Sequence, residues 1–147
     1  MPLNEALGTQ MELVNFELKN GYILSFDKWE LDIHNDFDLS CIENNTCNNT
    51  VIISLKRNNG SWVDSSQPAS ILIQFKSVSK FLKHQGTPAL ASDSNTIAFI
   101  GFLFPEDEIM NGYLDILTDA RQDLIIGLEN EGAIKIHAEQ VVVLARA

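Results

Sequence analysis

A carboxylate or an imidazole stands at every second position of one short stretch of this chain: Asp32, His34, Asp36 and Asp38. In an extended strand such positions lie on one face, about 6.6 Å apart. Neighbouring side chains there could share a divalent ion only where they converge or where a bulge intervenes. A calcium loop would also need glycine turns and a spaced glutamate, which this stretch lacks.

Three interpretations of this row follow. A solvated strand face is the simplest, a docking surface for a basic partner comes second, and a metal site comes last. The catalytic form of the last interpretation is a weak metal-dependent hydrolase centred on His34. We take the row as a partner-binding candidate without a metal.

Two further features are partner-binding candidates. The run Glu106, Asp107 and Glu108 is typical of a helix start, because carboxylates stabilise the positive end of a helix dipole, and it could also belong to an acidic docking surface. Trp62 lies beside a polar loop. Burial against the sheet is the first expectation for it, and an exposed interface anchor is the second.

The sequence contains few residues in patterns typical of catalytic sites. The three histidines, His34, His84 and His137, stand in no zinc-protease, nucleophile-elbow or phosphate-loop pattern. Glycine-rich loops are absent from the sequence, so nucleotide binding has no support. The sequence therefore predicts neither an enzyme nor a cofactor, with His84 solvated and His137 half-buried on the face of its strand opposite Ile134 and Ile136.

Charge and composition favour a soluble protein with a basic partner. The 147 residues include 20 acidic and 10 basic side chains, for a net charge of -10, which argues against binding nucleic acid through its phosphates. No apolar run approaches the roughly 20 residues that span a bilayer, and residues 1–8 lack a signal-peptide pattern. We expect a cytoplasmic protein, a monomer or weak homodimer that does not bind a membrane.

The two cysteines, Cys41 and Cys47, are close in sequence. Without a secretion signal, two such thiols are usually reduced, so free thiols are favoured over a disulfide, and a metal site is the least favoured.

The sequence predicts two hairpins with three-residue loops, one near each end of the chain. In the C-terminal one, Asn130-Glu131-Gly132 forms the loop with Gly132 in the left-handed conformation, pairing Leu128 with Ile134, Ile126 with Ile136 and Leu124 with Ala138. In the N-terminal one, Lys19-Asn20-Gly21 forms the loop, pairing Leu18 with Tyr22, Phe16 with Leu24 and Val14 with Phe26. Residues 141–144 form a β-branched run that predicts a further strand covered on both sides, at the centre of the sheet.

Alternation predicts the other strands: Trp29 to Cys41 as one strand, then strands around 51–55, 71–75 and 96–104. The segment after residue 75 fits either a short helix ending at Gly86 or a continued strand. Pro105, the following carboxylates and the apolar spacing predict an amphipathic helix over about 105–118. The sequence thus predicts an α+β, mostly β fold: a loose tail over 1–10 and one domain over 11–147, with an antiparallel sheet or sandwich of about eight strands and one helix.

In layout the chain resembles the small acidic immunity proteins of bacterial toxin systems. The resemblance rests on the acidic strand from Trp29 to Leu39, the Phe104-Pro105-Glu106 step and the terminal sheet from Leu124 to Leu144. It implies a non-catalytic inhibitor that covers the active site of one cognate basic toxin. The alternative is a small-ligand-binding β domain in which Phe99, Phe102, Tyr22 and Trp29 line a cavity.

Overall fold

The fold consists of two β-sheets. In the computed structural model, residues 10–87, 95–106 and 114–147 are described. They form ten strands: β1 (Glu12–Leu13), β2 (Phe16–Lys19), β3 (Ile23–Phe26), β4 (Trp29–Asp32), β5 (Phe37–Asn45), β6 (Thr50–Arg57), β7 (Ser70–His84), β8 (Ile97–Leu103), β9 (Asp123–Leu128) and β10 (Ala133–Arg146).

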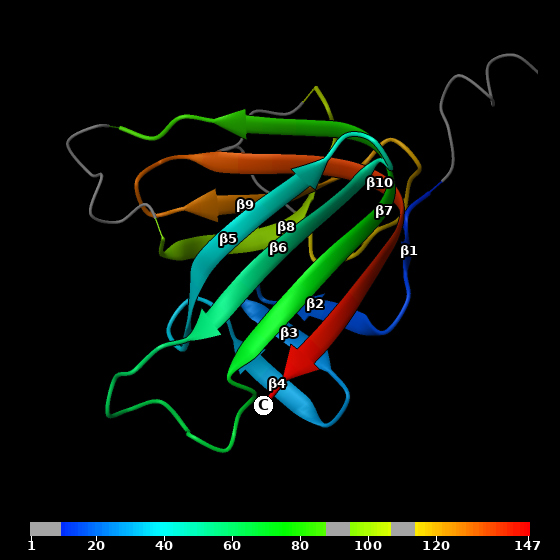
Figure 1. Cartoon of the computed structure of the whole chain (residues 1–147). Helices are drawn as coiled ribbons and strands as arrows, with labels where there is room; N and C mark the ends of the chain where they lie inside the picture. The colour runs from blue at the N-terminus through cyan, green and yellow to red at the C-terminus, as the bar shows by residue number, and fades with distance from the viewer. Residues whose placement is uncertain (1–9, 88–94, 107–113) are drawn as a thin grey trace, which may run out of the picture.

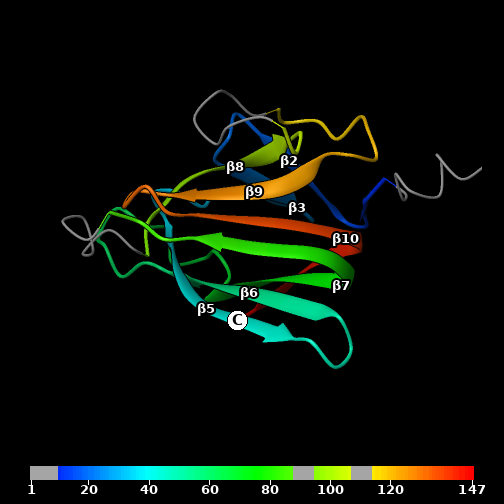
Figure 2. The same ribbon diagram turned by 90° about the horizontal axis from the view of Figure 1, so that it is seen from above.

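A seven-stranded sheet has the order β5-β6-β7-β10-β9-β8, with β1 paired to β10, and a three-stranded sheet has the order β2-β3-β4. The pairs are antiparallel except for β1 with β10, which is parallel. Figure 1 shows the small sheet behind the lower half of the large one. Seen from above, β9, β10, β7, β6 and β5 follow one another across the curved large sheet (Figure 2).

One face of the large sheet supplies most of the core. Ile53, Ile73 and Val143 lie side by side on three neighbouring strands, and none of them is exposed to solvent. Buried side chains of both sheets form one continuous apolar cluster. Each fully buried side chain of this size contributes about 1.5–3 kcal/mol to folding, so this face dominates the stability of the fold.

Strand β10 is the centre of the large sheet, as predicted for its C-terminal half, but residues 141–144 are not a separate strand. They continue the long strand that begins at Ala133. Only one face of this run is covered: Val141 and Val143 are buried, whereas Leu144 is 45% exposed. The prediction of a strand covered on both sides was wrong, because β-branched residues suit a half-buried strand equally well.

Both hairpins have three-residue loops, each placed one residue away from the predicted position. In the C-terminal hairpin Ile126 pairs with Ile134, and Glu131, with φ 72°, takes the left-handed position expected of Gly132. In the N-terminal hairpin Leu18 pairs with Leu24. The pairings therefore shift by two residues, which keeps every side chain on its predicted face.

The predicted strand from Trp29 to Cys41 is two strands in different sheets. Strand β4 ends at Asp32, residues 33–36 form a turn, and β5 begins at Phe37. The alternation still marks the core side, because Leu31, Ile33 and Phe37 are fully buried.

The predicted helix over 105–118 is not supported. The described residues contain no helix, and therefore none that could span a membrane. Pro105 and Glu106 form a turn, and Leu114 exchanges backbone hydrogen bonds with Phe102 of β8, at 2.8 and 2.9 Å. This pairing overrides the helical propensity at that end, while residues 107–113 lie outside the described part of the chain. The segment after residue 75, which the sequence left undecided, continues as strand to His84.

Candidate functional site

The turn between β4 and β5 is organised by the side chain of Asp32. One carboxylate oxygen, Oδ1, accepts hydrogen bonds from the backbone N–H groups of His34 and Asn35, at 3.0 and 2.9 Å. The other, Oδ2, accepts one from the Asn35 side chain, at 2.9 Å. Aspartate commonly stabilises turns in this way. Asp32 is thus committed to the turn and does not continue a row with Asp36 and Asp38.

The loop between β6 and β7 packs against this turn. The Asn58 backbone N–H donates to the backbone oxygen of Asp36, at 2.7 Å, and the Asn58 side chain donates to Asp38 Oδ2, at 3.0 Å. The Gln67 side chain donates to Asp36 Oδ2, at 3.2 Å. The loop therefore holds both carboxylates in place through neutral amide groups, which leaves their negative charge uncompensated by these contacts.

Trp62 lies at the surface where the loop meets the turn. Its side chain is 67% exposed, so the expected burial against the sheet was wrong. The indole Nε1 donates to the backbone oxygen of Asn35, at 3.4 Å, and the ring covers Gly60 so closely that an added Cβ would overlap it. Local contacts of the loop and turn thus hold the indole outside the core, beside Asp36.

A further acid and an internal cation belong to the same loop. Arg57 donates from Nη1 to the backbone oxygens of Ser65 and Gln67, which ties the loop to the end of β6. The backbone N–H of Ser66 donates to Asp64, at 2.8 Å, and this hydrogen bond lowers the pKa of the Asp64 carboxyl. Asp64 therefore remains ionised to a lower pH than an ordinary aspartate, so the loop that carries Trp62 also carries a negative charge.

A polar hollow of about 450 Å³ opens beside the turn. It is lined by Asp38, Lys56, Arg57 and three asparagines. Lys56 lies directly opposite Asp38 on the neighbouring strand, so the two charges partly offset each other. Asp36, which is half-buried, and Asp64, which is exposed, lie outside the strands and therefore have no cross-strand partner, although the charge of Arg57 also acts on Asp64.

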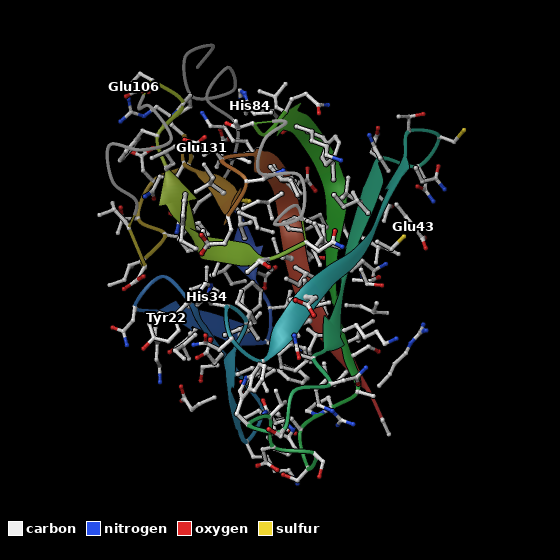
Figure 3. The ribbon with its side chains drawn as sticks, turned by 90° about the vertical axis from the view of Figure 1, so that its left-hand side faces the viewer. Tyr22, His34, Glu43, His84, Glu106 and Glu131 are labelled. Atoms are coloured by element: carbon white, nitrogen blue, oxygen red, sulfur yellow. The ribbon has the colours of Figure 1, made fainter. Side chains whose placement is uncertain are left out.

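His34 points away from this group. Its Nδ1 lies 2.6 Å from the backbone oxygen of Ile97 and 3.6 Å from a carboxylate oxygen of Glu129. Figure 3 shows it close to Tyr22 and well apart from Glu106. Within the described ranges, no three histidine, cysteine or acidic side chains are grouped closely enough to hold a metal ion.

The second acidic set is described only at its first member. Glu106 is exposed in the turn that follows β8. Asp107 and Glu108 lie outside the described residues, so their assignment to a docking surface stays a prediction.

The four aromatic residues of the alternative hypothesis do not share a cavity. Phe102 is fully buried in the main core, whereas the ring of Phe99 covers Gly127 on the opposite face of the sheet. Tyr22 is 38% exposed, and Trp29 borders a separate hollow near the C-terminus. The geometry therefore does not favour an aromatic-lined ligand site.

The sequence reasoning missed one buried charged group, on the outer face of the large sheet. Asp123 is 1% exposed, and its carboxylate lies 2.8 Å from Lys80 Nζ and 3.3 Å from His137 Nδ1. Burial raises the pKa of Asp123, but the hydrogen bonds from His137 and Lys80 outweigh it and hold the pKa below its ordinary value. His137 is half-buried on the predicted face, and a correct hairpin register would have placed Asp123 opposite it.

The thiols of Cys41 and Cys47 are free and exposed. Comparisons with protein families, with curated proteins and with solved structures found no match to this chain.

Proposed function

We propose that this chain is a non-catalytic protein-binding domain, an immunity-type inhibitor that neutralises one basic toxin in the bacterial cytoplasm by covering its active site. The observation that carries the proposal is the 67% exposed indole of Trp62, held beside the acidic turn. Tryptophan is enriched among the few residues that supply most of the binding energy at interfaces. An exposed tryptophan fixed by its own loop is thus a suitable anchor.

Charge supports the choice of a basic partner. The net charge of -10 attracts a cationic protein over long range and speeds encounter, whereas the anchor sets the lifetime of the complex. Asp36 and Asp64 lie on the two segments that position Trp62, so they would meet lysine or arginine side chains around the indole. The exposed free thiols of Cys41 and Cys47 support a reducing compartment such as the cytoplasm.

Affinity capture from a lysate of the source organism tests the proposal. The baits are the tagged wild-type protein, Trp62→Ala, and Leu82→Ala as a matched control, since Leu82 is exposed on the distant half of β7. We expect wild type and Leu82→Ala to retain one basic protein that Trp62→Ala loses. That protein should arrest growth when expressed alone and be neutralised by co-expression of the wild-type chain.

Two results would contradict the proposal. One is equal recovery of the same proteins by wild type and Trp62→Ala. The other is a captured protein that is harmless when expressed alone, which would leave a binding domain without an inhibitory role.

A further inference from the structure

A second surface, which shares no lining residue with the turn and loop around Trp62, forms an apolar groove. Its volume is about 420 Å³, and its apolar lining comes from three separate segments. Met11 and Leu13 lie in or next to β1, Leu18 comes from β2, and Ile116 and Leu117 come from the segment that leads to β9. A hydrogen bond from the Gln10 side chain to the backbone oxygen of Leu117, at 3.2 Å, joins the first and last of these segments.

Exposed apolar side chains are concentrated beside this groove. Of the seven large apolar residues that are exposed in the described part of the chain, three lie here: Tyr22, Leu114 and Ile116, the last at 68% exposure. They flank one contact, in which the Asp115 carboxylate accepts hydrogen bonds from the backbone N–H groups of Asn20 and Gly21, both at 3.0 Å. Figure 3 shows Tyr22 at the outer edge of the molecule. Several exposed apolar side chains gathered in one region commonly mark an interaction site.

The charge of the groove is negative. Among the described residues, its charged lining side chains are Glu17 and Asp115, without a lysine or arginine. The nearest cation in sequence, Lys19, is paired with Glu30 at 2.9 Å and also attracts Glu17, so it offsets part of the charge at that end of the rim, whereas Asp115 has no such cation among its contacts with the described residues. An apolar groove with a carboxylate rim complements a segment that carries apolar side chains flanked by cations.

We propose that this groove binds an amphipathic segment of another protein, in which apolar side chains fill the groove and lysine or arginine side chains pair with Glu17 and Asp115. The inference concerns a different surface from that of Trp62 and does not rest on the proposed function. It gives the chain a second binding site, able to hold a partner or a neighbouring subunit of the same complex.

Two other occupants fit the charge less well. Residues 1–9 contain Glu5 and neither lysine nor arginine, so they would add a carboxylate to an acidic rim. A second copy of the chain could offer the basic half of β7, which carries Lys76, Lys83 and the exposed Leu82. That segment belongs to the seven-stranded sheet. A second copy could therefore place it in the groove only together with the rest of that rigid sheet.

The probe is a phage-displayed library of random dodecapeptides, selected on the full chain and counter-selected on Ile116→Asp. We expect enriched peptides to combine apolar residues with lysine or arginine. Their affinity for wild type should fall about tenfold or more with Ile116→Asp and should also fall with Glu17→Gln. The matched controls, Leu82→Asp and Glu43→Gln, change exposed residues that do not line the groove and should leave binding unchanged, as should Trp62→Ala.

Amide chemical shifts measured with the best peptide locate the site directly. Shifts centred on residues 11–18 and 114–117 support the proposal. Peptides that bind Ile116→Asp as tightly as wild type, that lack an excess of cations, or that shift residues elsewhere would overturn it. Peptide binding that requires removal of residues 1–9, or a groove-dependent dimer in light scattering, would overturn it in favour of the other two occupants.

Discussion

The stripe of Ile53, Ile73 and Val143 across the large sheet and the turn-and-loop region around Trp62 are held together by different forces. The stripe consists of apolar side chains without solvent exposure, and its position follows from the period-two alternation of three strands. The loop region is held by hydrogen bonds between amides and carboxylates at partly exposed positions. Area removed from water stabilises the first, whereas the second is defined by directional contacts of modest net energy. The region that defines the fold is thus not the one that offers binding groups, and mutations should separate the two.

Truncating the stripe should have the largest effect on stability. Phe75 is fully buried between Val51 and Val141, so Phe75→Ala removes a large apolar side chain and leaves a cavity. We expect a loss of about 3–5 kcal/mol in the free energy of unfolding, measured by urea denaturation. Gln74→Ala, on the opposite face of the same strand, should cost far less; equal losses would show that this face does not form the main core.

The buried carboxylate of Asp123, with its partners Lys80 and His137, allows a third kind of contact to be tested, a buried ion pair. Asp123→Asn removes the charge that faces Lys80 and His137, and we expect a loss of about 1–3 kcal/mol at neutral pH, because a buried polar group loses partners while Lys80 remains partly exposed. Since the pKa of Asp123 is lower in the folded protein, its contribution is fully present above the ordinary value near 3.8 and is lost as the pH falls through the folded value.

The unfolding free energies of Asp123→Asn and wild type should therefore converge below the pKa that Asp123 has in the folded protein. Urea denaturation at a series of pH values checks this. A difference that persists unchanged in acid would show that the carboxylate charge is not what stabilises the group. Lys80→Met removes one partner and serves as the paired variant.

Weakening the contacts of the loop between β6 and β7 should have a smaller effect on stability, confined to the region around Trp62. Asn58→Ala removes the hydrogen bond to Asp38 and the one from the Gly60 N–H, at 2.7 Å. We expect a loss of about 1 kcal/mol, together with a changed emission of Trp62, measured in a Trp29→Phe background so that one indole remains. Asn59→Ala, at the neighbouring exposed position, is the control and should leave the emission unchanged.

Alternation made the core predictable, because it depends only on which side of a strand a residue occupies. Ile126 and Ile134 lie on the predicted face even though their pairing shifted by two residues. Loop position was harder to predict: Glu131 adopts φ 72° and Asn20 φ 57°, although glycine is the usual residue for such a conformation. The Asn130 side chain explains the first case, since it accepts a hydrogen bond from the Gly132 N–H at 2.8 Å and so fixes the turn.

The sequence located part of the turn-and-loop region around Trp62 but not its form, and the binding of a partner by these residues stays a prediction. Asp36, Asp38 and Trp62 were predicted as partner-binding residues, and the structure brings them together through Asn58 and Asn35. Nothing in the alternation reveals that Asp32 turns the chain, because a turn and a strand position can carry the same residue. The exposure of Trp62 depends on its contact with Asn35 in the turn between β4 and β5. These residues are far apart in sequence, so the alternation of residue types within one segment cannot predict the contact.

The smallest effect on stability should come from Gly60→Ala, which changes only the support beneath the indole. An added Cβ would overlap the Trp62 ring, and the ring, being the end of a flexible exposed side chain, can move away. We expect a change of about 0.5 kcal/mol or less in unfolding free energy, with a clear shift in Trp62 emission and weaker retention of the partner that wild type captures. Retention equal to that of wild type, with the ring displaced, would mean that the partner recognises the indole wherever it lies and that its fixed position contributes nothing. If both Gly60→Ala and Trp62→Ala lose the captured partner while their unfolding free energies stay close to that of wild type, the Trp62 side chain contributes to binding and not to folding.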